Sequence, residues 1–159
     1  MIVYHGTIEE IRCPDVYHSK KYLDFGKGFY VTSIKEQAEK WAIRKSMRRK
    51  EMPVVNCYDL QIDSGNYKVL KFDLDEEWLD FVCACRRGET INEGYDIVIG
   101  NVANDDVFKT VDMYFQGIWD KERTIRELRY YKKNNQICLV KQEVIDATLK
   151  FLKSYEVEM

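Results

Sequence analysis

Apolar and polar positions along the first third of the chain alternate first with a strand-like period and then with a helical one. Residues 1–5 and 28–32 are short apolar runs typical of buried strands, and the segment between them has the glycines and charges of a loop. The sequence SIKE from Ser33 to Glu36 has the spacing of a capping box, which begins a helix. Apolar residues then recur at helical spacing, at Ile34, Ala38, Trp41 and Ala42.

The middle of the chain contains two more strand-like runs, Val54 to Leu60 and Tyr67 to Phe72. The turn-forming residues 63–66 separate them, so the pattern predicts neighbouring antiparallel strands. A helix is predicted from about Leu74 to Arg87, because its apolar residues share one face. Its acids come first and its arginines last, as the helix dipole favours.

The last third interrupts strands with helices. Tyr95 to Gly100 and Asn135 to Val140 are strand-like, Asn104 is placed to cap a helix ending near Gly117, and a short helix is predicted over residues 123–132. Apolar spacing predicts a C-terminal helix marked by Val144, Ile145, Thr148, Leu149 and Leu152. Without a regular strand–helix alternation, this order indicates an α+β fold whose core is a split or mixed antiparallel sheet.

Composition indicates one folded domain over residues 1–159. Domains commonly have roughly 100 to 200 residues, and a chain of 159 residues with 45% hydrophobic residues and two prolines is typical of a folded protein. No apolar run approaches the roughly 18 residues that span a bilayer, and the N-terminus does not resemble a signal peptide. We therefore expect a cytoplasmic location and no membrane partner.

Cysteine and charge limit the chemistry further. The five cysteines are odd in number, and Cys83-Ala84-Cys85 has neither zinc nor redox spacing, so we expect reduced, mostly buried thiols and no metal. A net charge of -2 excludes a globally basic nucleic-acid binder. Two local basic segments remain, Arg44 to Lys50 and Arg123 to Lys133; both suit helix ends, and contact with RNA or DNA is the alternative.

Common catalytic motifs are missing from the sequence. The two histidines, His5 and His18, are not accompanied by a G-x-S-x-G elbow, which argues against a serine hydrolase of that type. Gly26-Lys27-Gly28 lacks the third glycine of the dinucleotide fingerprint and the Lys-Ser/Thr of a Walker loop. By themselves, these glycines are weak evidence for a phosphate loop.

Two motifs together are more informative: Tyr4-His5-Gly6-Thr7 and DFGKGFYVT, residues 24–32. Their combination resembles the ADP-ribosyltransferase superfamily, in particular the branch with poly(ADP-ribose) polymerases and diphtheria toxin. There, H-G-S/T and G-K-G-I-Y-F-like motifs form the NAD site. Within this branch the chain is most similar to a small bacterial and phage group that shares the YHGT, DFGKGFY, GxVAND and NQ stretches. The resemblance covers nearly the whole chain and implies a split sheet with flanking helices.

The resemblance also implies roles for individual residues, with NAD as the substrate. His5 would hydrogen-bond a ribose 2′-hydroxyl, the backbone of Gly6 would hold the nicotinamide amide, and Thr7 would lie beside the ribose. Tyr30 would stack on the nicotinamide ring. Trp41, eleven residues after Tyr30, matches a second stacking aromatic, whereas its helical periodicity assigns it to the core. Both interpretations of Trp41 stay open.

A glutamate usually hydrogen-bonds the ribose in this superfamily, and Gln136 occupies the matching position. A neutral amide keeps the hydrogen bond but lacks the charge that stabilises the developing cation. Losing one preorganised electrostatic group costs on the order of 100- to 1000-fold in rate. Gln136 is therefore compatible with slow mono-ADP-ribosyl transfer and not with chain elongation.

Further candidates each have two interpretations. The segment Asn104-Asp105-Asp106 forms a helix cap with first-turn acids, or one of its aspartates supplies an acid to the site; Asp24 shapes a turn or supplies that acid. Lys27 is solvated or meets the NAD pyrophosphate. Gly28, like the other glycines of its motif, would let the backbone approach a ligand closely.

Three functions follow from these residues. The leading hypothesis is an NAD-dependent mono-ADP-ribosyltransferase, a toxin or phage-defence effector, that modifies a protein or nucleic acid and has an antitoxin protein as a candidate partner. The second is a catalytically inactive transferase fold that binds NAD, ADP-ribose or a partner protein, for which Gln136 argues. The third is an RNA-processing relative that acts on a phosphate, for which the run from Arg44 to Lys50 argues.

Overall fold

The computed structural model describes residues 1–63, 65–132 and 134–159, with the backbone alone described at residues 105 and 106. Ser64 of the expected turn and Lys133 of the second basic segment lie outside the described residues. In chain order the elements are β1 (Ile2–Thr7), β2 (Phe29–Val31), α1 (Lys35–Arg49), β3 (Val54–Leu60), β4 (Val69–Lys71), α2 (Glu76–Arg86), the 3-10 helix η1 (Ile91–Gly94), β5 (Ile97–Gly100), α3 (Asp105–Phe115), α4 (Lys121–Leu128), β6 (Gln136–Leu139), α5 (Gln142–Thr148) and β7 (Leu149–Glu156).

The strands form two sheets. In the first, of order β1-β3-β7, both pairings are antiparallel. In the second, of order β2-β6-β5-β4, β4 and β5 are parallel and the other pairs antiparallel. A bridge joins the two sheets, because the backbones of Tyr4 and Thr32 exchange hydrogen bonds of 2.8 and 2.9 Å. The expected α+β class, with mixed and antiparallel sheets, is confirmed.

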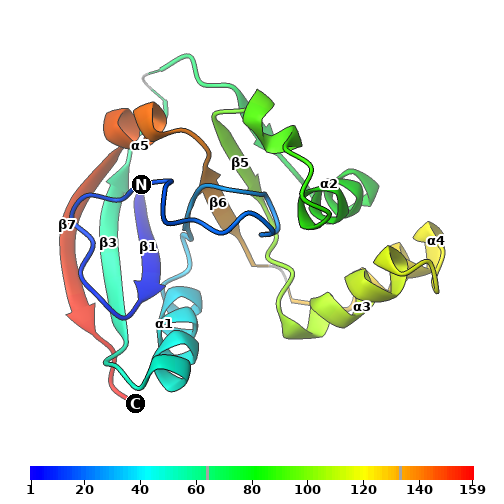
Figure 1. The fold of residues 1–159 in the computed structure, drawn as a ribbon, viewed down its shortest axis with the longest axis horizontal. Coiled ribbons are helices and arrows are strands. Elements are labelled where there is room, and N and C mark those ends of the chain that lie inside the picture. Colours follow the sequence, from blue (N-terminus) through cyan, green and yellow to red (C-terminus); the bar gives the residue numbers. More distant parts are fainter. Residues whose placement is uncertain (64, 133) are drawn as a thin grey trace.

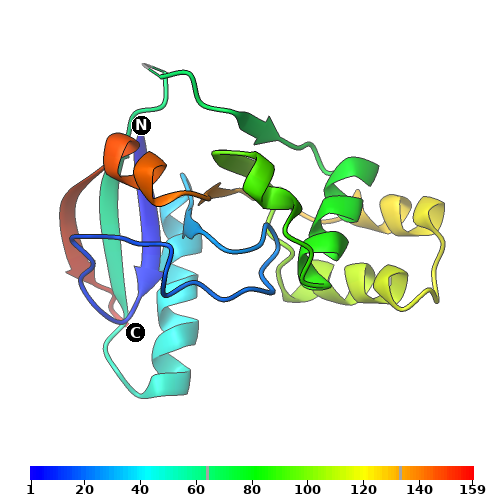
Figure 2. The same cartoon turned by 45° about the horizontal axis from the view of Figure 1, so that its top comes forward.

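Helices cover both sheets (Figure 1). Helix α1 lies beside β1 and β3, whereas α2, α3 and α4 gather beyond β5 at the opposite end of the molecule (Figures 1 and 2). Three buried clusters fill the spaces between these layers. One lies between α1 and the first sheet, one between the two sheets and α5, and one around the fully buried Trp78, between the second sheet and α2 to α4.

The contact of α1 with β1 depends on Gly6. A Cβ atom at this position would collide with the carbonyl oxygen of Ala38 and would lie 2.8 Å from the backbone nitrogen of Ala42. Glycine therefore lets the helix and strand backbones touch. This contact fixes where α1 lies relative to His5, the residue before Gly6.

The expected capping box is wrong. Helix α1 begins at Lys35, after Ile34, whose side chain makes no capping bond. The hydroxyl of Ser33 instead accepts a hydrogen bond of 2.6 Å from the side chain of Asn135, and Thr32 Oγ1 accepts one of 3.1 Å from the Ile34 N–H. The Ser33 side chain, which local spacing predicted to cap the helix, thus binds Asn135, about a hundred residues further along the chain.

Two expectations about strands are also wrong. β4 does not pair with β3, because β1 and β7 occupy both edges of β3 and β4 pairs in parallel with β5. The C-terminal helix ends at Thr148, and Leu149 and Leu152 belong to β7. Pairing along the whole length of β3 overrides the helical spacing of these residues.

The cysteines match the expectation of mostly buried thiols. Four are free and buried, and Cys13 is free and exposed. Burial raises the pKa of Cys138 to about 12 and of Cys83 to about 11, so these thiols are protonated at neutral pH. In the described parts of the chain, no helix has both the length and the apolar character needed to cross a membrane.

Candidate functional site

A cavity of about 910 Å³ lies where the two sheets, α1 and the segment between β1 and β2 meet. That segment, drawn in blue, crosses from the first sheet toward the second (Figures 1 and 2). Seven of the residues singled out from the sequence line the cavity: His5, Thr7, Asp24, Gly28, Tyr30, Trp41 and Gln136. The structure thus brings together side chains from β1, β2, α1 and β6.

His5 is held as a neutral imidazole. Alternation along β1 places it on the face opposite Gly6, where its ring stacks on Phe29 with centroids 4.5 Å apart. Its Nδ1 lies 2.7 Å from the Tyr30 carbonyl oxygen. Because that oxygen only accepts, Nδ1 carries the hydrogen and Nε2 keeps a lone pair. Burial lowers the pKa of His5 to about 4, against the Tyr30 carbonyl bond and with a smaller contribution from Lys45.

Tyr30 presents its ring to the cavity while its hydroxyl holds the glycine-containing loop. The hydroxyl accepts a hydrogen bond of 3.1 Å from the Phe25 N–H and donates one of 2.5 Å to the Gly26 carbonyl. Burial raises the pKa of Tyr30 well above its usual value, so the hydroxyl stays protonated. The loop and the aromatic ring are therefore positioned together.

The two glycines of this loop are required by packing within the chain. Gly26 has a φ of +76°, and a Cβ there would lie 2.8 Å from the Asn92 side chain. A Cβ at Gly28 would collide with the Cys138 sulfur and lie 2.8 Å from the Leu139 carbonyl oxygen. These contacts explain both glycines without any ligand.

Trp41 and Lys45 reach the cavity from the same helix. They are four residues apart on α1 and so occupy one face of it. Lys45 Nζ donates a hydrogen bond of 2.9 Å to Thr7 Oγ1, and Thr7 is fully buried. In the sequence Lys45 belongs to the basic helix end, and its spacing of four residues from Trp41 is the signal that it shares the site.

Asp24 is a junction between three parts of the fold. Its Oδ1 accepts hydrogen bonds of 3.2 and 2.7 Å from Nε and Nη2 of Arg86 on α2. Its Oδ2 accepts one of 2.9 Å from the Ala103 N–H and one of 3.1 Å from Gln136 Nε2. Both carboxylate oxygens therefore have hydrogen-bond partners. Asp24 neither simply shapes a turn nor offers a free acid; it links separate segments of the fold. Arg86 was not predicted as a partner of Asp24, because an arginine at its position suits a helix end.

Gln136 uses its amide nitrogen as a donor. It is 4% exposed, and Nε2 donates to Asp24 Oδ2 at 3.1 Å and to the Asn101 carbonyl at 3.3 Å. A glutamate has no such donor at neutral pH and would face the carboxylate of Asp24. The amide at this position is therefore explained by the neighbouring Asp24.

The two residues before Gln136 hold neighbouring segments, a role missed from the sequence. Asn134 Oδ1 accepts a hydrogen bond of 2.8 Å from the Val102 N–H. Asn135 Oδ1 accepts bonds of 2.9 Å from Thr32 Oγ1 and 3.0 Å from the Ser33 N–H. Val102 itself lines the cavity. The two amides therefore hold the segment after β5 and the segment after β2 in place beside β6.

Three predicted site residues lie elsewhere, and a fourth is outside the described side chains. Gly6 packs against α1, and Lys27 is exposed and outside the cavity lining. Asn104 caps α3, since its Oδ1 accepts a hydrogen bond of 3.1 Å from the Val107 N–H, which supports the capping interpretation. The side chain of Asp105 lies outside the described residues.

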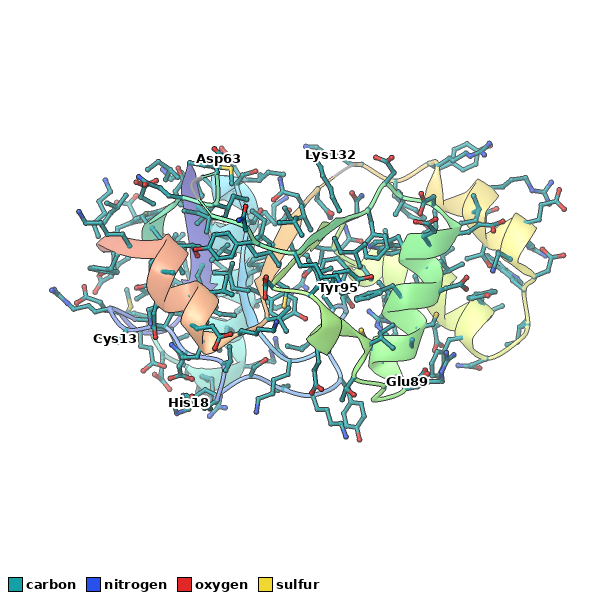
Figure 3. All side chains as sticks on the ribbon, turned by 90° about the horizontal axis from the view of Figure 1, so that it is seen from above. Cys13, His18, Asp63, Glu89, Tyr95 and Lys132 are labelled. Atoms are coloured by element: carbon teal, nitrogen blue, oxygen red, sulfur yellow. The ribbon has the colours of Figure 1, made fainter. Side chains whose placement is uncertain are left out.

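The β1–β2 segment adds charged groups that the sequence analysis did not place in the site. Arg12 Nε lies 2.5 Å from Glu10 Oε1, and His18 Nδ1 lies 2.9 Å from Asp15. Figure 3 shows His18 at the edge of the molecule, and its side chain is 90% exposed. These pairs form the open rim of the cavity, whereas His5, Tyr30 and Gln136 lie deeper.

Comparison with known proteins gives one match. The family described as "Protein of unknown function (DUF3990)" matches residues 1–151. No curated protein and no solved structure matches the chain.

Proposed function

The chain belongs to the DUF3990 family, whose description assigns no activity, and from the geometry of the cavity we propose that the protein is an NAD-dependent mono-ADP-ribosyltransferase. The acceptor is a protein or nucleic acid. A role as a toxin or phage-defence effector would suit this activity, and an antitoxin protein would then be its regulatory partner.

One observation carries the proposal: His5, Tyr30, Trp41 and Gln136 line a single cavity. They come from four different elements, and more than ninety residues separate Trp41 from Gln136. The resemblance to ADP-ribosyltransferases assigns these same four residues to the NAD site. A chance resemblance in short motifs gives no reason for the four side chains to share a cavity.

The chemistry proposed for the site is displacement at the ribose carbon that carries nicotinamide. Tyr30 and Trp41 would hold the planar ring, and Nε2 of the neutral His5 would accept a hydrogen bond from a ribose hydroxyl. The glycosidic bond breaks and its electron pair leaves with nicotinamide. A nucleophilic atom of the acceptor bonds to the ribose carbon and loses its proton.

Gln136 limits the expected rate. Its amide would orient the ribose, but the negative charge behind it, on Asp24, is already paired with Arg86 at 2.7 Å. The developing positive charge is therefore stabilised less than it would be by a free carboxylate. We expect slow single transfers.

The test is incubation of the protein with NAD labelled in its adenylate part in a cell lysate, followed by separate nuclease and protease treatment. Label should enter macromolecules. Release of the label by nuclease identifies the acceptor as nucleic acid, and release by protease identifies it as protein. Nicotinamide release is measured in parallel. The proposal fails if the folded protein releases no nicotinamide from NAD with any lysate.

Trp41→Leu is the sharpest variant for this assay, because the Tyr30 hydroxyl also holds the loop. Losing one face of the ring site should lower nicotinamide release about 5- to 150-fold, the loss expected from about one to three kcal/mol of stacking. Trp119→Leu is the matched control, since Trp119 lies between α3 and α4 and outside the cavity lining. Equal activity in the two variants contradicts the site assignment.

A second candidate function is supported by the Asp24–Gln136 contact. Because Gln136 Nε2 is bound to Asp24, the cavity can hold NAD or ADP-ribose without cleaving a glycosidic bond. Calorimetry that detects NAD binding in the absence of any nicotinamide release would favour this inactive binding module over the transferase.

A further inference from the structure

The cations around the cavity differ in how they are paired. Arg86 binds Asp24 and Arg12 binds Glu10, so these two charges are compensated. Among the residues that the structure describes, Lys20 and Lys45 line the cavity without a carboxylate within ion-pair distance. These two lysines are therefore the cavity cations that remain to be compensated.

Lys45 has an unusual orientation for a surface lysine. Such side chains normally keep the ammonium in water and bury only the stem. Lys45 differs: the residue is exposed, but its Nζ donates a hydrogen bond of 2.9 Å to the hydroxyl of the buried Thr7. The ammonium thereby gives up hydration and gains one neutral partner.

The charges near Lys45 act in both directions. Burial is the main cause that lowers its pKa, and Arg49, Lys20 and Arg48 lower it further, while Glu9 opposes them. Glu9 makes no ion pair with Lys45 in the described part of the chain. An anion entering the cavity would relieve both the repulsion and the incomplete hydrogen bonding.

We infer that Lys45 and Lys20 form a subsite for the diphosphate group of a dinucleotide. That the dinucleotide is NAD rests on the proposed function. Lysine ammonium groups commonly bind phosphate as point charges. Lys45 thus takes the role of binding diphosphate that the sequence suggested for Lys27. Lys27 is exposed and lies outside the cavity lining.

The position of Lys45 along α1 agrees with this ligand. Four residues of helix span about 6 Å, so Lys45 lies one turn beyond Trp41 on the same face. A ring held at Trp41 would place its ribose between the two side chains and its first phosphate toward Lys45. A lone carboxylate ligand would not extend across both positions.

Calorimetry with three probes tests the inference: ADP-ribose, which has the diphosphate, and adenosine and nicotinamide, which do not. Lys45→Gln should weaken ADP-ribose binding about 10- to 100-fold, as expected for one charge-assisted hydrogen bond. Binding of adenosine and nicotinamide should stay within about twofold. The affinity of the natural protein for ADP-ribose should also fall as salt rises, and that of Lys45→Gln should fall less.

Lys40→Gln is the matched control, because Lys40 is exposed on α1 and outside the cavity lining. It should bind all three probes as the natural protein does. The inference is overturned if the natural protein does not bind ADP-ribose, if Lys45→Gln binds it unchanged, or if Lys45→Gln weakens nicotinamide as much as ADP-ribose.

Turnover separates this inference from the proposed function. If Lys45→Gln selectively loses ADP-ribose affinity while the natural protein releases no nicotinamide from NAD, the diphosphate subsite stands and the transferase proposal fails. If NAD is turned over with the same KM by both proteins, the transferase stands and the subsite is wrong.

Discussion

At the scale of single residues, the contact between Gln136 and Asp24 decides what the cavity can do. The amide nitrogen lies 3.1 Å from a carboxylate that also accepts two bonds from Arg86. Placing a glutamate at position 136 would therefore disturb the contacts of the fold as well as the cavity. A gain of activity is not the expected result.

Gln136→Glu should lower the free energy of unfolding by about 1–3 kcal/mol at pH 7, since it leaves buried acceptors unpaired and brings two carboxylates together. Gln116→Glu is the control: Gln116 Nε2 donates to Asp112 at 2.7 Å, but both side chains are exposed to water. There we expect a change within about 0.5 kcal/mol. Urea denaturation measures both, and equal losses would contradict the prediction.

His5 should make stability depend on pH. Burial lowers its pKa from the usual 6.5 to about 4 in the folded protein, so the unfolded chain binds the proton first as the pH falls. Stability should be unaffected by His5 above pH 6.5 and should decrease between pH 6.5 and 4, by up to about 3 kcal/mol. Denaturation of the natural protein and of His5→Gln at several pH values measures this difference. Parallel stability curves would argue against it.

At the scale of elements, the packing of α1 on β1 positions much of the site. The helix supplies Trp41 and Lys45, and the strand supplies His5 and Thr7. Their separation is set by backbone contact at Gly6, where no side chain fits. A change at this contact should therefore affect both the stability and the shape of the cavity.

Gly6→Ala should destabilise the protein by about 3 kcal/mol or more, because the added methyl group meets rigid helix backbone. Gly94→Ala provides the comparison, since a Cβ at Gly94 would have no atom within 4 Å. Its effect should stay within about 0.5 kcal/mol. Thermal unfolding of the two variants distinguishes them; similar midpoints would mean that α1 can shift away from β1 without cost.

Local sequence predicted individual elements better than their pairing. β3 has the bounds expected from its apolar run, Val54 to Leu60, and α3 follows the expected cap at Asn104. The position of β4 depends on which edges remain open after β1 and β7 have paired with β3. No feature within residues 67–72 contains that information. The same applies to Ser33, whose partner Asn135 comes from another part of the chain.

The cavity lining was predictable to a similar extent. Motifs pointed to His5, Tyr30 and Gln136, which lie together. Lys45 and Arg86 were missed because a cation near a helix end already has a local explanation. Only the direction of each side chain, set by packing, separates the cations that face the cavity from those in solvent.

At the scale of the whole molecule, Asp24 connects the β1–β2 segment with α2, β6 and the residues after β5. Its side chain is 12% exposed and that of Arg86 16% exposed. Removing one partner of a mostly buried pair leaves the other charge uncompensated. The junction should therefore contribute to global stability.

Asp24→Ala should lower the free energy of unfolding by about 3–5 kcal/mol. Asp80→Ala is the matched control, because Asp80 accepts from Lys121 at 2.9 Å and Tyr114 at 3.0 Å on the surface, with 51% of its side chain exposed. Exposed pairs contribute about 1 kcal/mol or less. Chemical denaturation measures both variants. The same loss of free energy in both would show that the Asp24 junction contributes no more to stability than an exposed ion pair does.

The pairing of β2 also determines when this cavity can form during protein synthesis. β2 lies at the edge of its sheet, and within the described chain β6 is its one neighbouring strand. A ribosome therefore makes His5 and Tyr30 more than a hundred residues before it makes the strand that holds β2 in place. Because a domain generally folds as a unit, a nascent chain has no completed cavity until β6 (Gln136–Leu139) has emerged.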